Sequence, residues 1–168
     1  LRLREGVPEV VYSRDMDFAV EPDLYGLFGS RTSALQGLRD LADMHKLCYS
    51  VLGLEKLPKG RACFRAMLNQ CNGVCCGRES EADHAARLVS ALETLRVATW
   101  PYPGAIGLEE TCEDMQQIHV VRNWCYLGSA DTRQEARKLA KVVAGFDADG
   151  YKILCRPILT GQARILPL

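Results

Sequence analysis

The sequence predicts an α+β fold in which short antiparallel strands and three to four helices are organised around a group of cysteines. Apolar residues recur at helical spacing after Ser30 and again after Ser80, and each of these serines can cap a helix. Short apolar runs bounded by Gly and Pro indicate strands on both sides of the helical region. Five of the eight cysteines lie between Cys48 and Cys76. We therefore expect the helices to bring these cysteines together.

Residues 1–30 predict an N-terminal hairpin followed by a loop. The strands are expected at Leu1–Arg4 and Glu9–Ser13, because the residues between them include a Gly and a Pro that can supply a turn. An acidic loop follows, and the apolar run Leu24–Phe28 predicts a short strand or a turn.

Residues 31–99 predict a helical region that carries the clustered cysteines. The first helix begins after Ser30 and brings Cys48 to its end. A short helix is expected within Ala62–Gln70. A long helix after Ser80 is expected to pack over the cysteine stretch.

Residues 100–168 predict an α+β C-terminal region. Strands are expected at Ala105–Glu109 and Gln117–Leu127, and the second is apolar enough to be a central strand. A helix over residues 131–143 and a last strand over Tyr151–Leu159 complete the region. The three parts of the chain are expected to form one compact unit.

No targeting or membrane segment is expected. The first residues, Leu1–Glu5, are not followed by an apolar run like that of a signal peptide, and no stretch of about 18 apolar residues could span a bilayer. We expect a cytoplasmic protein, in which thiols stay reduced and a group of cysteines more often holds a metal. Because the chain begins at Leu1 within a strand pattern rather than at Met, we also expect it to be a fragment of a longer protein.

The cysteine spacing is C-x14-C-x7-C-x3-C-C. Structural zinc usually takes two close cysteine pairs, whereas only Cys71 and Cys75 form one here. Iron–sulfur clusters are held by four thiolates and tolerate varied spacings, which favours Cys48, Cys63, Cys71 and Cys75 as cluster ligands. Zinc at the same four cysteines, and buried thiols without a metal, remain open alternatives. Cys76 is expected to point elsewhere, because adjacent residues cannot easily aim at the same atoms.

Residues near the cysteines are expected to support them. The Asn72-Gly73 dipeptide should break the short helix and turn backbone N–H groups toward sulfur. His84 and His119 are expected to be structural. No role is predicted for the remaining cysteines, Cys112, Cys125 and Cys155.

The basic residues are concentrated around the cysteines. The chain as a whole has no net charge, but residues 31–78 carry eight basic and three acidic side chains. Such a surface suits contact with phosphates, although a solvated face has a similar composition. The candidate DNA-binding residues are Lys59, Arg61, Arg65 and Arg78. A second basic face is expected on the helix that carries Arg133, Arg137, Lys138 and Lys141.

No catalytic set emerges from the sequence. It contains no G-x-S-x-G, Walker or G-x-G-x-x-G motif. The carboxylates Glu109, Glu110, Glu113 and Asp114 fall in an apparent hairpin turn, where acidic residues more often serve solvation than acid–base catalysis. A stand-alone enzyme that uses these carboxylates with a divalent metal is the weaker alternative.

Several stretches resemble a known family. Leu24–Arg31, followed by a helix, resembles the segment after the GIY-YIG nuclease domain in the UvrC-type excinucleases. Gly60–Phe64 and Gln70–Ser80 resemble the cysteine motif of that family. Three later stretches resemble its shorter, Cho-type members: Trp100–Gly104, Asn123–Gly128 and Gly145–Cys155.

The resemblance implies the region that follows the nuclease domain in a bacterial nucleotide excision repair endonuclease. Such an enzyme cuts 3′ to a lesion in damaged duplex DNA, after the protein UvrB is in place, through an upstream GIY-YIG domain that needs Mg²⁺ or Mn²⁺. It implies a [4Fe–4S] cluster on Cys48, Cys63, Cys71 and Cys75. It also implies no nuclease activity from these residues alone, and we expect a monomer. The alternative is a zinc-bound protein-interaction module without DNA contact.

Overall fold

The computed structural model describes residues 1–58, 60–112 and 115–168. Lys59, predicted to contact DNA, lies outside the described residues, as do Glu113 and Asp114 of the predicted acidic turn. By its internal contacts the chain divides into two compact units. The cysteine unit comprises residues 1–12 and 23–97, and the sheet unit comprises residues 13–22 and 98–168. The sequence-based division into residues 1–30, 31–99 and 100–168 stays a prediction.

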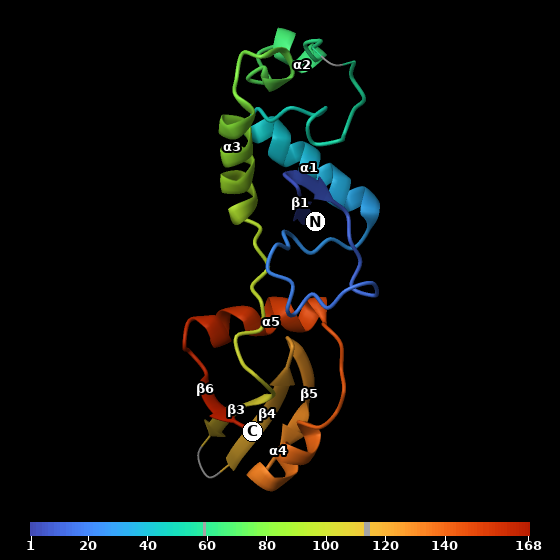
Figure 1. The fold of residues 1–168 in the computed structure, drawn as a ribbon. Coiled ribbons are helices and arrows are strands. Elements are labelled where there is room, and N and C mark those ends of the chain that lie inside the picture. The colour runs from blue at the N-terminus through green and yellow to red at the C-terminus, as the bar shows by residue number, and fades with distance from the viewer. Residues whose placement is uncertain (59, 113–114) are drawn as a thin grey trace. The chain divides into compact units, whose positions relative to one another are not determined.

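The cysteine unit contains a hairpin and three helices, with one turn of 3-10 helix between the last two (Figure 1). Its elements are β1 (Arg2–Arg4), β2 (Val7–Glu9), α1 (Arg31–Met44), α2 (Phe64–Met67), the 3-10 turn η1 (Val74–Cys76) and α3 (Glu81–Glu93). β1 and β2 pair in antiparallel fashion, which confirms the predicted hairpin. Leu24 and Tyr25 make only isolated bridges, so the Leu24–Phe28 segment is a turn with bridges and not a strand.

The two longer helices of this unit begin at their predicted caps. Ser30 Oγ accepts from the Ser33 backbone N–H at 3.1 Å, and Ser33 Oγ accepts from the Ser30 N–H at 3.0 Å, which satisfies two N–H groups that a helix start leaves unpaired. Ser80 Oγ accepts from the Asp83 N–H at 3.0 Å. Because both helices carry an apolar stripe, they pack together. The core between them includes Ala34, Leu38, Leu41, Leu88, Ala91 and Leu92.

The sheet unit is a four-stranded antiparallel sheet with two helices. Its elements are β3 (Ile106–Cys112), β4 (Met115–Arg122), β5 (Cys125–Ala130), α4 (Arg133–Leu139), α5 (Ala148–Leu159) and β6 (Arg164–Pro167). The strand order is β5-β4-β3-β6.

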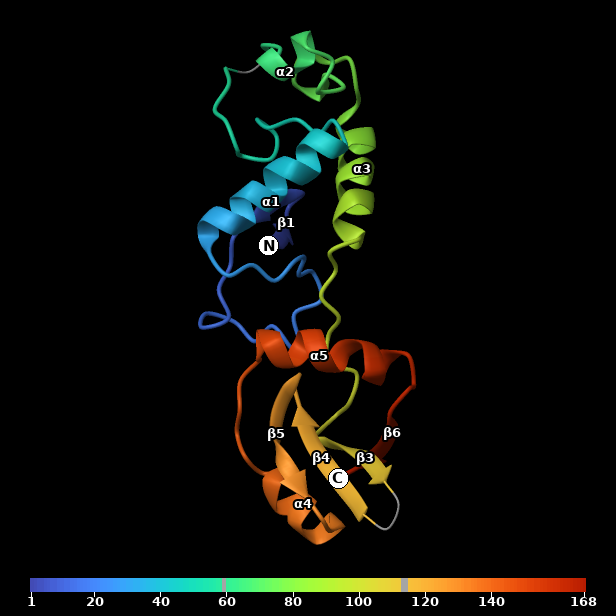
Figure 2. The ribbon, with the colours of Figure 1, turned by 180° about the vertical axis from the view of Figure 1, so that it is seen from behind.

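Each face of this sheet packs against one helix. Ile106 and Val121, directly opposite each other on β3 and β4, share one apolar cluster with Ile158 of α5. Ile118 and Val120 point to the other face and share a cluster with Ala136 of α4. Both ribbon views show α4 beside β5 (Figure 2). The centre of the sheet is therefore buried on both sides.

The predicted single strand over Gln117–Leu127 is wrong, because the structure divides it into β4 and β5. Asn123 and Trp124 form the turn between them, with φ of 54° and 64°. Asn is common in such left-handed conformations but Trp is not. Burial of the Trp124 side chain, which is 0% exposed, compensates for that conformation.

The predicted last strand over Tyr151–Leu159 is also wrong, because these residues belong to α5. The Asp147 carboxylate starts the helix by accepting from the Asp149 N–H at 3.3 Å and from the Gly150 N–H at 2.9 Å. The strand that fills the sheet edge is β6, which the sequence did not predict. The helix predicted over residues 131–143 is confirmed but shorter, since α4 ends at Leu139.

The α+β class with antiparallel strands is confirmed, and the described residues form five α-helices where three to four were predicted. None of the helices in the described part of the chain has both the length and the apolar character needed to cross a bilayer.

Candidate metal centre

Four cysteine sulfurs converge at one end of the cysteine unit. The Sγ atoms of Cys48, Cys63, Cys71 and Cys75 all lie within 4.8 Å of one another. Three of these cysteines are buried and Cys75 is half-buried. The structure therefore brings together the same four cysteines that the spacing selects. That they act as ligands stays a prediction.

Cys48 is positioned by both long helices of the unit. It follows α1 by four residues, and the intervening chain turns sharply because Lys46 takes a φ of 51°. Its backbone N–H donates to His84 Nε2 of α3 at 3.0 Å. Only a neutral imidazole with its proton on Nδ1 can accept there, and burial lowers the pKa of His84, which keeps the ring neutral. The hydrogen bond from Cys48 to His84 thus explains why α3 packs against the cysteine stretch, as predicted.

The other three cysteines come from a compact loop held by backbone contacts to sulfur. Cys63 directly precedes α2, and its N–H donates to Cys75 Sγ at 3.4 Å. The Gly73 N–H donates to Cys71 Sγ at 3.3 Å. Gly73 has a φ of 90°, and a Cβ at this position would lie 2.8 Å from Arg78 Cβ, so only glycine fits. The Gly73 N–H thus points toward sulfur as predicted. The Asn72-Gly73 dipeptide does not break the short helix, however, because α2 already ends at Met67.

The thiols have different proton affinities. Burial raises the pKa of Cys71, and it raises the pKa of Cys75 to about 11. Burial acts in the same direction on Cys48, but hydrogen bonds from the Ser50 hydroxyl and from the Val51 and Ser50 N–H groups outweigh it and lower the pKa of this thiol. A bound cation would reverse the effect of burial, because a coordinating thiol gives up its proton. Four such thiols could hold a metal ion.

The four thiols fit a metal centre, and the distances between their sulfurs bear on whether it is a zinc ion or an iron–sulfur cluster. Four thiolates at Zn–S distances of about 2.3 Å sit at the corners of a tetrahedron with edges of about 3.8 Å. The observed spread of up to 4.8 Å is close to that value. A four-iron cluster places its iron and sulfide atoms between the thiolates, so the sulfurs would have to lie farther apart.

The centre can be reached from solvent on one side. A groove of about 1090 Å³ runs along it and is lined by Val51, Val74, Cys75 and His84, among others. Arg61 also lines this groove. Small reagents can therefore approach Cys75 but not the three buried cysteines directly.

The predicted DNA-binding arginines have different surroundings. Arg61 and Arg78 are exposed. The Arg65 side chain is only 12% exposed, and its guanidinium bonds Asp43 at 2.6 Å, donates to the Gln70 carbonyl at 3.0 Å and lies 4.0 Å from the centre of the Tyr49 ring. Arg65 therefore ties the α2 loop to α1, and Arg61 and Arg78 are the ones available to a partner.

Two positioning residues had no distinct sequence signal. One is His84, described above. The other is Arg87, which donates from Nε to the His45 carbonyl at 3.0 Å and forms a two-pronged ion pair with Glu79. Glu79 lies at the end of the cysteine motif, so Arg87 joins that end to the end of α1. Arg87 lies on the inner side of α3, whereas the other charged residues of that helix face solvent. This position on the helix could have suggested its positioning role.

The remaining cysteines lie apart from the centre. Cys76 Sγ donates to the Gly73 carbonyl at 3.4 Å and is not one of the four grouped sulfurs, in agreement with the prediction. Cys112, Cys125 and Cys155 belong to the sheet unit. The described residues contain no second group of potential metal ligands.

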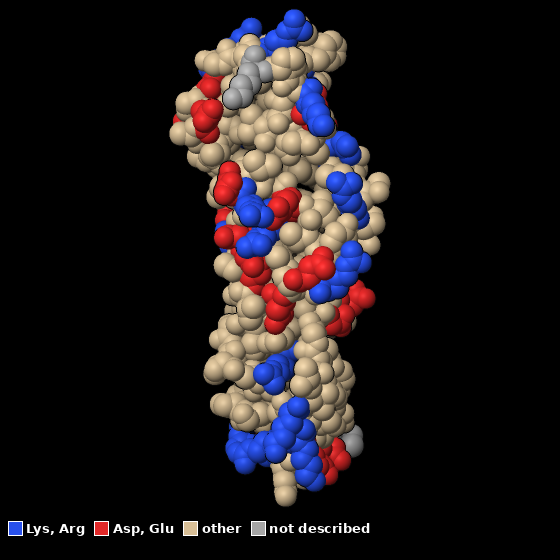
Figure 3. All heavy atoms as spheres, turned by 45° about the vertical axis from the view of Figure 1, so that its right-hand side comes forward, with Lys and Arg blue, Asp and Glu red and all other residues tan. Residues whose placement is uncertain are grey.

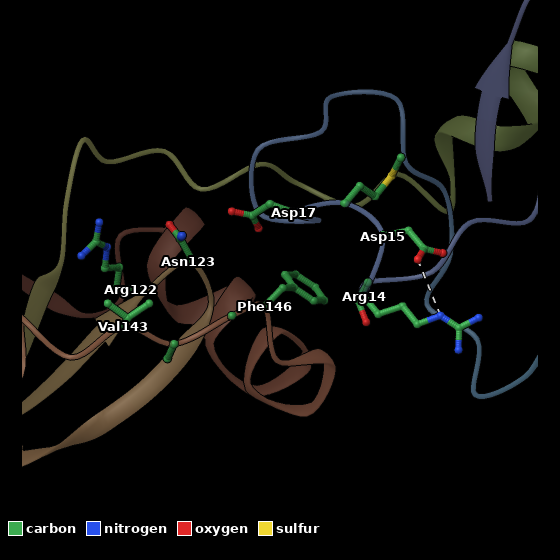
Figure 4. A pocket seen from close by; sticks show the side chains of 11 residues that line it. Arg14, Asp15, Asp17, Arg122, Asn123, Val143 and Phe146 are labelled. Carbon is green, nitrogen blue, oxygen red and sulfur yellow. Dashed lines mark ion pairs between the residues drawn. The ribbon is translucent and has the colours of Figure 1, made fainter.

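A pocket of about 520 Å³ in the sheet unit offers no catalytic arrangement. It lies between the 13–17 loop, the β4 end and residues 143–146 (Figure 4). Arg14 pairs with Asp15 at 3.7 Å, and Asp17 accepts from the Ala19 N–H at 2.9 Å. Neither cysteine nor histidine is among its described lining residues. Arg14, Asp15 and Asp17 are thus engaged within the loop.

The fold and the site define a class of protein: an α+β module with four grouped cysteines that could hold a metal ion and with exposed arginines in the same stretch. The chain belongs to the UvrC/Cho excinuclease family. Residues 1–94 match the UvrC/Cho excinuclease middle domain, and residues 105–168 match the excinuclease Cho C-terminal domain. The resemblance stated from the motifs is confirmed.

Curated relatives match the chain over its whole length. Proteins named excinuclease cho are 51% identical in Escherichia coli O6:H1, 50% identical in Escherichia coli K12 and 51% identical in Salmonella typhimurium LT2, each over 168 residues. The alignment covers 100% of this chain and 57% of each relative. The chain therefore spans little more than half the length of these relatives. No solved structure matches it.

Proposed function

We propose that this chain is the DNA- and UvrB-binding region of a bacterial nucleotide excision repair endonuclease that incises 3′ to a lesion through an upstream GIY-YIG domain. The observation that carries the proposal is the membership of both units in the excinuclease family. The described residues offer no catalytic set. The role that remains for them is to bind DNA and the partner protein so that the nuclease domain meets the correct phosphodiester bond.

The cysteine end of the chain would supply the DNA contact. Arg61 and Arg78 are exposed next to the metal centre, and Lys59 lies in the same sequence stretch. Lysine and arginine side chains of this kind bind the phosphate backbone and carry no sequence preference, which suits an enzyme that must act wherever damage occurs. Arg65 would act indirectly, by fixing the loop that carries Arg61.

A [4Fe–4S] cluster held by Cys48, Cys63, Cys71 and Cys75 is our proposal for the centre, based on the cysteine motif. Binding the cluster would move the four sulfurs farther apart than the present 4.8 Å or less. The cluster would be structural: bound metal stabilises a loop that has little apolar core of its own. The chain's own contribution is to exclude water from three thiols and to aim the N–H groups of Cys63 and Gly73 at sulfur.

The test of DNA binding is a double charge reversal, Arg61→Glu with Arg78→Glu. We expect affinity for duplex DNA to fall by about tenfold or more at low salt. The slope of log affinity against log salt concentration should become shallower by an amount that corresponds to about two phosphate contacts. Binding is measured by fluorescence anisotropy over a range of salt concentrations.

The matched control is Arg31→Glu, because Arg31 is exposed and starts the 14-residue helix α1, about 20 Å from the helix end that leads to Cys48. It should bind like the parent. If the double reversal binds DNA unchanged, the contact lies elsewhere, and the basic face of α4 is the next candidate.

A zinc-bound protein-interaction module without DNA contact is the second candidate, and one observation favours it. The sulfur separations of at most 4.8 Å suit a single tetrahedral ion. Iron, acid-labile sulfide and zinc, quantified on anaerobically purified protein, separate the two. Iron with equal sulfide and a brown colour supports the cluster, whereas one zinc per chain with no colour supports the zinc module.

A further inference from the structure

The short helix α2 turns an apolar face to solvent. Phe64, Met67 and Leu68 are 67%, 66% and 51% exposed. They occupy positions i, i+3 and i+4, so they lie together on one side of the helix turn. Three large apolar side chains that gather on one exposed face indicate an interaction surface. We name these three residues the apolar wedge.

The wedge cannot turn inward, because α2 is fixed on its other side. The helix lies between Cys63 and Cys71, two of the four converging cysteines, and Ala66 faces the same core with 2% exposure. Arg65 locks its flank through Asp43, as described above. Burying the wedge would require breaking these contacts. The metal centre therefore supports the wedge from behind.

The sequence stretch that contains the wedge is basic. Residues 56–78 contain five basic side chains and no acidic one. In the space-filling view, blue spheres lie at the tip of the cysteine unit, where α2 lies, and red spheres begin a short way below that tip (Figure 3). Arg61 and Arg78 are both exposed in this stretch.

An apolar surface within a cationic stretch fits a partner that presents flat apolar groups between regularly spaced negative charges. Unpaired DNA bases flanked by their phosphates have this composition. Phe, Leu and Met are also side chains that proteins insert at unstacked base steps. A fully paired duplex offers the phosphates but hides the base faces.

We propose that the apolar wedge of Phe64, Met67 and Leu68 packs against unpaired bases while Arg61 and Arg78 hold the adjoining phosphates. This inference rests on the proposed DNA-binding function and assigns its preference: DNA in which a few bases are locally unpaired binds more tightly than paired duplex. The wedge recognises unpaired bases and not a particular base sequence.

The test compares a duplex with the same duplex containing a short run of mismatched bases. The parent chain should bind the mismatched form more tightly. In the double variant Phe64→Ala with Leu68→Ala, this preference should fall about tenfold, whereas affinity for the paired duplex and its salt dependence should stay unchanged. A fluorescent base analogue in the mismatched run should report stacking with the parent and none with the variant.

Two further variants control for folding and for chemistry. Met44→Ala removes another exposed apolar side chain of the same unit, 77% exposed on α1, and should leave the preference intact. Phe64→Trp keeps an aromatic ring and should retain or increase it. Each variant must carry the same metal content as the parent, which shows that the centre behind the wedge is formed.

The inference fails, with DNA binding still standing, if the parent binds both DNA forms equally or if the double variant keeps the preference. It also fails if the double variant loses only its binding to UvrB, because the wedge is then a protein-docking face. If the parent binds no DNA at all, the proposed function itself is wrong.

Discussion

The two units of this chain build their cores from different materials. The sheet unit closes on aromatic rings: Trp124 makes edge contacts with Trp100 and Tyr151 at centroid distances of 5.0 and 5.1 Å. The cysteine end of the other unit has a small core in which Cys48, Cys63 and Cys71 are the buried side chains together with Ala66. Aromatic side chains bury a large area, whereas thiols and a methyl group bury little.

The difference indicates where each unit obtains its stability. The sheet unit can fold on apolar packing and its strand pairing. The loop between α1 and α3 lacks such packing, so it depends on whatever joins its four sulfurs. Loss of the metal should therefore affect one part of the chain and spare the other.

The largest expected effect is that of Cys71→Ala. Structural metal sites contribute on the order of 10 kcal/mol to folding, and removing one of four ligands forfeits most of it. We expect residues 46–79 to lose their protection from hydrogen exchange while tryptophan fluorescence stays native. Both tryptophans of the chain, Trp100 and Trp124, report on the sheet unit alone.

Cys125→Ala is the control for this variant, since Cys125 is a half-buried cysteine of β5 outside the metal centre. It should keep both the metal and the exchange protection. If Cys71→Ala retains protected loop amides without metal, the loop has a sufficient core of its own and the contrast between the units is wrong.

The next largest effect is expected from Trp124→Ala in the sheet unit. Trp124 is 0% exposed, and its indole N–H donates to the Ala98 carbonyl at 3.0 Å. Removing the ring should destabilise this unit by about 3–5 kcal/mol, measured by denaturant unfolding that is followed by Trp100 fluorescence. Metal content should not change.

Val143→Ala serves as its control, because Val143 is 93% exposed and in the same unit. Loss of metal from Trp124→Ala would mean that the two cores are coupled and not independent.

The smallest expected effect is a loss of stability of the sheet unit at alkaline pH, which the cysteine end should not share. Burial raises the pKa of Tyr151 from the ordinary 10 to about 12. The folded state therefore keeps a proton that the unfolded state releases. Stability from this group is complete below pH 10 and is lost as the pH rises toward 12. Because Tyr151 is only half-buried, we expect a loss of about 1–2 kcal/mol.

The measurement is the unfolding free energy of the sheet unit between pH 9 and pH 12, the range set by these pKa values. Tyr151→Phe should flatten the slope, although it also removes the acceptor of the Ala98 N–H, 2.9 Å away. The cysteine end should not follow this slope, because metal ligands are already deprotonated. An equal slope in Tyr151→Phe would assign the titration to another group.

Local sequence signals were sufficient to predict the structure where a single residue determines it. Ser30 and Ser80 cap the helices that they predict, because a hydroxyl that accepts an orphan N–H acts within one turn. Gly73 similarly marks a backbone position where a side chain would not fit. The grouping of four cysteines could also be predicted from their spacing.

Apolar periodicity alone was not sufficient in the sheet unit. Tyr151–Leu159 has the composition of a buried strand, but the Asp147 cap makes it a helix, and its first turn fits against the β4–β5 turn because Gly150 has no side chain. A Cβ there would lie 2.4 Å from the Trp124 carbonyl oxygen. The turn itself needs Trp124 in a left-handed conformation, which no local preference favours.

Motifs, caps and ligand spacings act over short distances, so the order of residues was enough to establish the family, the α+β class, the two capped helices and the choice of four cysteines. Folding in three dimensions was needed to show that Arg65 is engaged with Asp43, that His84 supports Cys48, and that α5 rather than a strand covers the sheet. Each of these depends on residues far apart in the chain, whose contacts exist only once the core has formed.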